Sequence, residues 1–119
     1  MIISKKVSFD AAHFLPNYNG KCKDLHGHHW VVEVACRGEV DERTGMVIDF
    51  KDLKEWLRLL EETFDHKLVN DIITNPTAEN ICSFVYEKFE IWCVSRKVEI
   101  DFVRIWETED SMAELRRRY

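Results

Sequence analysis

Hydrophobic and polar positions along this chain follow two different periods, and the changes of period predict the order of strands and helices. Segments near both ends alternate in polarity or form short apolar runs, which is typical of strands. Two central segments repeat apolar residues every three or four positions, which is typical of helices. The pattern predicts strands at about 2–13, 26–39, 46–48, 98–107 and 113–115, with both helices between the third and fourth strands.

Both predicted helices begin at a residue that can cap an N-terminus. Asp49 is expected to cap a helix that ends at about Phe64, and Thr77 a helix that reaches Trp92, because short oxygen-bearing side chains accept hydrogen bonds from the first turn. Each helix has one apolar stripe and should bury one face. The stripes are Phe50, Leu53, Trp56, Leu57, Leu60 and Phe64, and then Ile81, Phe84, Val85, Phe89 and Trp92 with the stem of Lys88.

The order of the elements predicts an α+β fold. Strands and helices do not alternate regularly, which favours an antiparallel sheet with both helices on one face. The segments 31–35 and 98–106 have apolar residues on both faces, and two helices cover only one. We therefore expect the other face to pack against neighbouring subunits of a homo-oligomer. A chain of 119 residues without repeats or linkers is predicted to form one domain, 1–119.

Composition and charge narrow the classes of function. The formal net charge is −5, and the one basic cluster, 116–118, is interpreted as a solvated tail, so no nucleic-acid partner is expected. No apolar run is long enough to span a bilayer, and the first residues resemble a strand rather than a signal peptide, so a cytoplasmic location is expected. Cys36, Cys82 and Cys93 lie in apolar segments and are predicted to be core residues.

Three histidines are the most informative candidate site. His26 and His28 are two residues apart in a strand and therefore share a face, while His13 ends the preceding strand. Three neutral imidazoles with an open fourth position are typical of a catalytic zinc. Spacing alone leaves structural histidines as the alternative. His29 faces the opposite way and is interpreted as structural.

Four further residues are candidates for proton transfer or binding, each with a simpler alternative. Cys22 lies in a polar loop between two lysines, which favour the thiolate, although most loop cysteines have no function. Asp65 and His66 follow the first helix and form either an acid–base pair or a helix end. Glu107 ends a strand, where a carboxylate is either solvated or able to accept two parallel N–H bonds.

Six motifs taken together resemble the 6-pyruvoyl-tetrahydropterin synthase / 6-carboxytetrahydropterin synthase family, over essentially the whole chain. The resemblance implies the tunnelling fold, a four-stranded antiparallel sheet with two helices on one side. It also implies trimers whose sheets form a barrel, commonly stacked as hexamers, with active sites between subunits. The motifs are Phe9–His13, Cys22–His28, Asp49-Phe50, Asp65-His66, Asn75–Asn80 and Trp106–Thr108.

The resemblance also implies a role for each candidate residue. His13, His26 and His28 would bind Zn²⁺. Cys22 would be the catalytic base, with Asp65 and His66 completing the proton relay. The family's pterin anchor corresponds to Glu107, and hydroxyls near the pterin correspond to Thr77 and Thr108.

The family substrate is 7,8-dihydroneopterin triphosphate, and the branches differ in product. One branch forms 6-carboxy-5,6,7,8-tetrahydropterin and acetaldehyde on the way to queuosine-type deazaguanine bases, and the short chain favours it. The alternative branch stops at 6-pyruvoyl-tetrahydropterin. A third group has glutamate in place of Cys22 and acts as an aldolase, so the cysteine argues against it.

Non-catalytic alternatives are a zinc- or pterin-binding oligomer and an unmetallated structural oligomer. The chain departs from the commoner family pattern at His29-Trp30. Its triphosphate site is unassigned, with Lys21, Lys23 and Arg104 as candidates.

Overall fold

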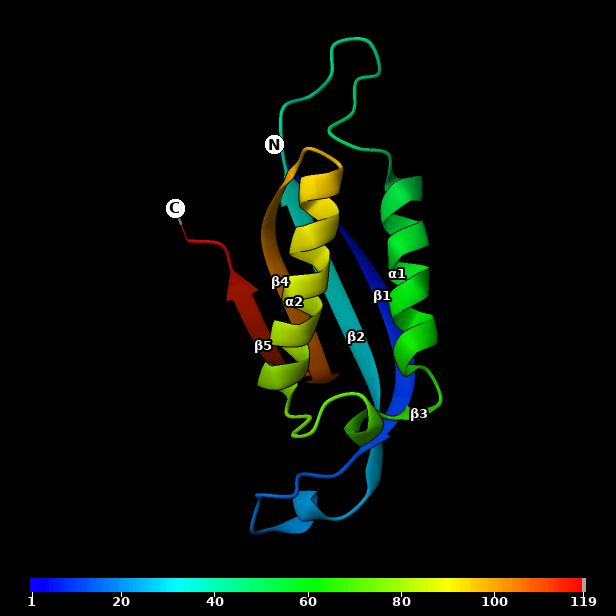
Figure 1. Cartoon of the computed structure of the whole chain (residues 1–119), viewed down its shortest axis with the longest axis vertical. Helices are drawn as coiled ribbons and strands as arrows, with labels where there is room; N and C mark the ends of the chain where they lie inside the picture. The colour runs from blue at the N-terminus through cyan, green and yellow to red at the C-terminus, as the bar shows by residue number, and fades with distance from the viewer. Residues whose placement is uncertain (119) are drawn as a thin grey trace.

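The computed structural model describes residues 1–118 and shows one sheet with two helices on one of its faces (Figure 1). The strand order is β3-β1-β2-β4-β5, and every neighbouring pair is antiparallel except β3, which runs parallel to β1. The helices and strands are β1 (Ile2–His13), β2 (His26–Arg37), α1 (Phe50–Phe64), β3 (Lys67–Leu68), α2 (Ala78–Ser95), β4 (Glu99–Thr108) and β5 (Ser111–Arg116), with short 3₁₀ turns at Lys21–Lys23 and Val69–Asp71.

The predicted α+β class with four long antiparallel strands and two helices on one face is confirmed. The sheet gains a fifth strand, β3, which has two residues and was not predicted because so short a segment has no periodicity of its own.

The core lies between the helices and the sheet. Alternation along β1 buries Phe9 and Ala11, and β2 contributes Trp30 and Val32. The ring of Phe9 stacks on Phe64 at the end of α1 with centroids 5.3 Å apart. The three cysteines predicted to be core residues, Cys36, Cys82 and Cys93, are all buried.

Both predicted N-caps are confirmed. Oδ1 of Asp49 accepts a hydrogen bond from the backbone N–H of Lys51, and Oγ1 of Thr77 accepts one from the N–H of Asn80. These bonds satisfy donors that the first helical turn cannot pair internally.

We expect Asp49→Ala to lower the free energy of unfolding by about 1 kcal/mol, because it removes the cap of α1. Asp49→Asn is the matched control and should stay close to wild type, since an amide oxygen also caps. Urea denaturation of the three proteins measures the difference. Equal losses for both variants would contradict a capping role.

The predicted strand at 46–48 is wrong. These residues belong to a loop that Asp41 closes: its Oδ1 accepts from the N–H groups of Arg43 and Thr44, and Gly45 adopts a positive φ of 73°. The segment bonds within this loop instead, because the carbonyl of Met46 accepts from the N–H of Asp41 at 2.9 Å, and no strand of the described sheet pairs with it. A short apolar run does not form a strand without a partner edge.

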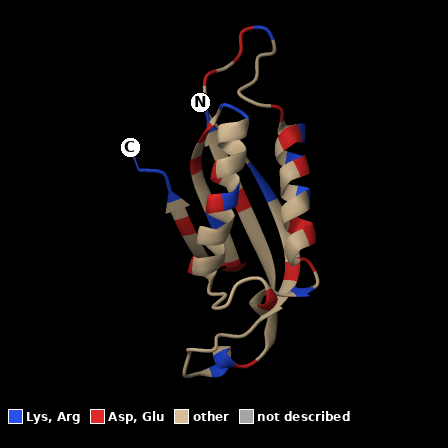
Figure 2. Ribbon diagram, in the orientation of Figure 1, with Lys and Arg blue, Asp and Glu red and all other residues tan. Residues whose placement is uncertain are grey.

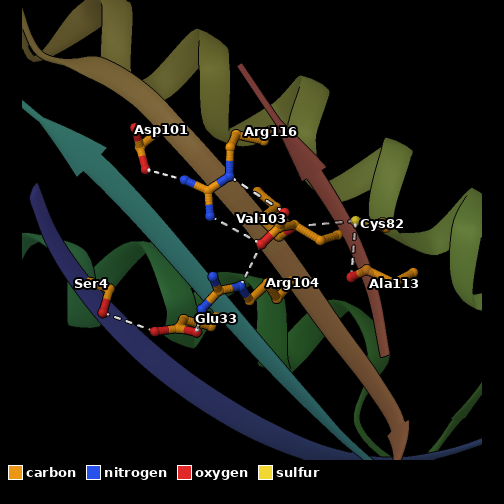
Figure 3. A network of polar contacts seen from close by, with 9 residues as sticks. Ser4, Glu33, Cys82, Asp101, Val103, Arg104, Ala113 and Arg116 are labelled. Carbon is orange, nitrogen blue, oxygen red and sulfur yellow. Dashed lines mark hydrogen bonds and ion pairs between the residues drawn. The ribbon is translucent and has the colours of Figure 1, made fainter. Parts of the chain in front are cut away.

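The open face of the sheet, away from the helices, is more polar than the sequence pattern predicts. Glu33 of β2 accepts hydrogen bonds from Ser4 (2.9 Å) and Arg104 (3.2 Å), and Arg104 also donates to Glu114 of β5 at 2.7 Å (Figure 3). Arg116 extends this chain of contacts to Asp101 at 3.1 Å. The face therefore combines paired charges with apolar side chains, and its coverage by other subunits stays a prediction.

Charged residues are dispersed over the helices and strands rather than gathered into one basic stripe (Figure 2). No helix in the described part of the chain is both long and apolar enough to cross a membrane.

Candidate active site

The three predicted histidine ligands meet at one end of the sheet, where β1 ends and β2 begins (the lower end in Figure 1). The antiparallel register pairs His13 with His26 and Ala11 with His28. The Nε2 atoms of His13 and His26 are 3.0 Å apart, and the ring centroids of His26 and His28 are 4.8 Å apart. Register and alternation together thus bring the three imidazoles to one point.

Glu107 joins this cluster. Its Oε1 lies 3.2 Å from Nε2 of His13 and 3.4 Å from Nε2 of His28. One ligand atom from each of His13, His26, His28 and Glu107 lies within 4.8 Å of the others. Glu107 falls at a register shift between β4 and β5, and an irregularity of this kind redirects a side chain. The sequence predicted Glu107 as a ring anchor, which stays a prediction, and did not predict its place in the cluster.

Backbone carbonyls set the orientation of two of these rings. Nδ1 of His13 lies 2.8 Å from the carbonyl oxygen of Pro76, and Nδ1 of His26 lies 2.7 Å from that of Asp24. A carbonyl only accepts, so each Nδ1 carries the proton and each Nε2 turns a lone pair toward the cluster.

Two lone pairs 3.0 Å apart beside a carboxylate oxygen repel one another unless a cation lies among them. The donor set therefore fits a metal ion, and imidazole nitrogen with carboxylate oxygen suits zinc.

Burial keeps the imidazoles of His13 and His28 neutral, which is the form that binds a metal ion. Desolvation lowers the pKa of His13, which is fully buried, below its ordinary value of 6.5, and neighbouring His26 lowers it further. Desolvation also lowers the pKa of His28. Both rings are therefore neutral at pH 7, as metal binding requires. Trp30 packs edge-to-face on His13 and His28 and shields the cluster from the core side.

Asp65 and His66 form the second feature of the site. Oδ2 of Asp65 lies 2.8 Å from Nδ1 of His66, so the ring's Nε2 is free for proton transfer. Asp10 of β1 holds the pair in place: its N–H donates to Oδ1 of Asp65 at 3.0 Å, and its carbonyl accepts from the N–H of His66 at 2.7 Å. His66 adopts a positive φ of 57°, a conformation that these long-range bonds maintain.

The hydrogen bond from the N–H of Asp10, together with the bond to His66, lowers the pKa of Asp65 below its ordinary value of 3.8. A carboxyl group with a lowered pKa stabilises the fold above its ordinary value, and that contribution is lost as the pH falls through the lower, folded value. We expect ¹³C NMR to show the Asp65 carboxyl titrating below 3.8. A midpoint at or above 3.8 would contradict the two hydrogen bonds.

Cys22 lies apart from this pair within one chain. It is half-buried in the turn Lys21–Lys23, and its carbonyl accepts from the N–H of Leu15 at 2.9 Å. Within residues 1–118 no hydrogen bond joins its thiol to His66. His28 of the cluster and His66 line one cleft, whereas Cys22 lies on a separate loop.

Two clefts have His28 in their lining. The β4 cleft has a volume of about 620 Å³, and the β3 cleft about 590 Å³. His28, His29 and Gly27 line both clefts. The β4 cleft is further lined by Lys6, Val31, Trp106, Glu107 and Thr108, and the β3 cleft by Asp10, Ala12, His66 and Lys67.

The remaining predicted residues lie in different parts of the structure. Thr108 lines the β4 cleft and its hydroxyl donates to Oδ1 of Asp110 at 2.9 Å. The hydroxyl oxygen of Thr77 caps α2, which leaves its proton available to donate. Arg104, a candidate for the triphosphate, is held by Glu33 and Glu114 on the open face, whereas Lys21 and Lys23 are exposed.

An α+β sheet with two helices on one face and a three-histidine cluster at its end is typical of a tunnelling-fold protein, and the cluster is a candidate metal site. Residues 2–118 match the family described as 6-pyruvoyl tetrahydropterin synthase. The chain belongs to this family.

Relatives support the assignment and differ in their named reactions. A protein of Archaeoglobus fulgidus, provisionally named 6-carboxy-5,6,7,8-tetrahydropterin synthase, is 42% identical over 98% of this chain and 96% of its own. The enzyme of that name from Haemophilus influenzae is 30% identical over 94% and 96%. Dihydroneopterin monophosphate aldolase of Pyrococcus furiosus is 33% identical over 92% of each chain.

Among solved structures, 6-pyruvoyl tetrahydropterin synthase of Caenorhabditis elegans has a TM-score of 0.87 and 29% identity, covering 99% of this chain and 96% of its own. The named relatives are thus tetrahydropterin synthases and an aldolase, which are enzymes of the lyase type.

Proposed function

We propose that this chain is a zinc-dependent lyase that converts 7,8-dihydroneopterin triphosphate to 6-carboxy-5,6,7,8-tetrahydropterin, with release of acetaldehyde and triphosphate. The observation that carries the proposal is the convergence of the histidine Nε2 atoms with Glu107, two of the rings being held by carbonyls behind them. The names of the Archaeoglobus and Haemophilus relatives support the carboxylated product.

His13, His26 and His28 would hold the zinc ion. The chemistry that zinc supplies when bound is polarisation of the hydroxyl oxygens on the substrate side chain, which makes these groups and the neighbouring C–H bonds more acidic. Glu107 is partly exposed to the β4 cleft and anchors the pterin ring through its exocyclic amine and ring N–H, which a planar carboxylate accepts in parallel. Thr108 and Thr77 supply hydroxyls near the ring.

Proton movement is assigned to three residues. The thiolate of Cys22 is the base that removes a proton from the substrate side chain. Asp65 holds Nδ1–H of His66, so Nε2 of His66 takes up or returns a second proton. Cys22 meets Asp65 and His66 across an interface in a homo-oligomer, a trimer or hexamer, which accounts for the separation of these residues within one chain.

Mass spectrometry of the products after incubation of the zinc-loaded protein with 7,8-dihydroneopterin triphosphate tests the proposal. Carboxytetrahydropterin together with acetaldehyde is the expected result. The second candidate is 6-pyruvoyl-tetrahydropterin synthase, which the similarity to the Caenorhabditis enzyme favours, and 6-pyruvoyl-tetrahydropterin would identify it. Absence of any product would favour a non-catalytic zinc- or pterin-binding oligomer.

A further inference from the structure

Cys36 and Cys93 lie at the end of the sheet opposite the histidine cluster, where β2 and α2 end and β4 begins (Figure 1). Cys36 pairs across the sheet with Ile100 of β4. The carbonyl of Cys93 accepts a hydrogen bond from the N–H of Val98 at 3.1 Å, which holds the last turns of α2 against the start of β4. Both cysteines are buried in the same core cluster. Register and chain connection therefore bring them together from the two layers of the fold.

The thiols of this pair share a hydrogen bond. It lowers the pKa of the Cys36 thiol below its ordinary value of 9.0 and raises the pKa of the Cys93 thiol above it. Cys93 is thus the donor and Cys36 the acceptor, because an accepted hydrogen bond favours the thiolate. Both are free thiols, and a thiol with thiolate character beside a second thiol is the arrangement from which a disulfide forms.

A cleft between α2 and β4, with a volume of about 550 Å³, gives solvent a path toward the pair. Cys93, Val94 and Ile100 are among the residues that line this α2 cleft. The hydrogen-bond partner of Cys36 and its cross-strand partner therefore both border the cleft. A small oxidant such as hydrogen peroxide can enter it, whereas a protein cannot reach thiols that are buried to this degree.

We propose that Cys36 and Cys93 form a reversible disulfide that fastens the last turns of α2 to the end of β2, with a peroxide as the oxidant. The Cys36 sulfur attacks one oxygen of hydrogen peroxide, and the O–O bond breaks. Cys36 becomes a sulfenic acid, and the other oxygen leaves as water with the thiol proton of Cys36.

The Cys93 sulfur then attacks the sulfur of Cys36. The S–S bond forms, the S–O bond breaks, and the hydroxyl group leaves as a second water with the thiol proton of Cys93. Two thiols are thus oxidised to one disulfide while one hydrogen peroxide is reduced to two waters. A small thiol reverses the change by thiol–disulfide exchange. The pair lies far from the histidine cluster along the sheet, so this inference does not depend on the proposed reaction.

Peptide mapping of the zinc-loaded wild-type protein tests the linkage. Trypsin cuts after lysine and arginine and therefore places the four cysteines in four different peptides, 22–23, 24–37, 68–88 and 89–96. After hydrogen peroxide and alkylation of the remaining thiols, we expect peptides 24–37 and 89–96 to be joined, with a mass two hydrogen atoms below their sum. Dithiothreitol should separate them.

Cys82 is the internal control for this mapping. It is also buried, but its thiol donates to the carbonyl oxygens of Val103 at 3.4 Å and Ala113 at 3.8 Å (Figure 3). Burial raises its pKa to about 11. Peptide 68–88 should therefore be recovered alkylated.

Thermal unfolding tests the structural effect. Cross-linking two distant positions of the chain restricts the unfolded state, so oxidation should raise Tm of the wild type by about 5 °C or more, and dithiothreitol should reverse the rise. Cys93→Ala should show no rise on oxidation, whereas Cys82→Ala should show the wild-type rise. Each protein is compared with its own reduced form.

Three results would overturn the inference. They are alkylation of both Cys36 and Cys93 after peroxide treatment, a disulfide that joins either of them to Cys22 or Cys82 instead, and a Cys36–Cys93 linkage that leaves Tm unchanged or lower. The mapping uses the wild-type protein, so its outcome does not depend on the folding of a variant.

Discussion

Replacing His28 with alanine should remove the metal and the activity together. The three imidazoles supply the nitrogen ligands of the cluster, and Nε2 of His28 also lies 3.4 Å from Oε1 of Glu107. Because Glu107 is assigned to the substrate ring, the variant leaves two histidine ligands, and such a site binds zinc weakly, since catalytic zinc sites use three protein ligands. We expect zinc content measured by elemental mass spectrometry to fall from about one ion per chain to near zero. Turnover should fall to the background rate.

His29→Ala is the matched control for metal content. His29 is the next residue in β2, but its ring points to the opposite face and its Nδ1 lies 2.8 Å from Oδ1 of Asp10. The control should keep its zinc. Full activity of a metal-free His28→Ala protein would exclude the histidine cluster from the reaction, and loss of zinc from both variants would point to a general disturbance of β2.

Replacing Cys22 with alanine should keep the zinc and lower kcat by about 100-fold or more, the low end of a general-base effect. The thiol is half-buried in the loop between β1 and β2, and the structure places it outside the histidine cluster. Its loss therefore removes a proton acceptor without removing a ligand. Steady-state kinetics and elemental analysis of the same preparation measure the two effects.

Asn19→Ala, an exposed substitution in the same loop, is the control and should retain near-wild-type turnover. A rate for Cys22→Ala within a few-fold of wild type would remove its role as the base. Loss of zinc from the Cys22 variant would instead give the thiol a place at the metal, contrary to the geometry of the cluster.

Local sequence patterns predicted the long elements of this fold well. Asp49 and Thr77 cap the helices as expected, because capping depends on a side chain and the two or three residues that follow it. The strand at 46–48 was wrong because a strand must pair with another strand, and which segments pair depends on residues far away in the sequence. The two-residue β3 forms because β1 offers it a partner.

On the open face of the sheet, the sequence pattern likewise did not predict which charged residues pair. Apolar residues on both faces of β2 and β4 predicted a face covered by other subunits, and the structure adds ion pairs from Arg104 to Glu33 and Glu114 across three strands. Charges that look solvated along one strand become partners only when the register places them side by side.

The sequence by itself determined that His26 and His28 share a face, that His13 ends the neighbouring strand, and that the chain is similar to a family with a zinc triad. A period of two residues and an antiparallel connection suffice for the first two conclusions. Only the tertiary structure decided that Glu107 points into the cluster, that the carbonyls of Pro76 and Asp24 orient two of the rings, and that Asp10 holds the Asp65–His66 pair. These contacts depend on a register shift and on loop conformations, which long-range packing sets and which no local period encodes.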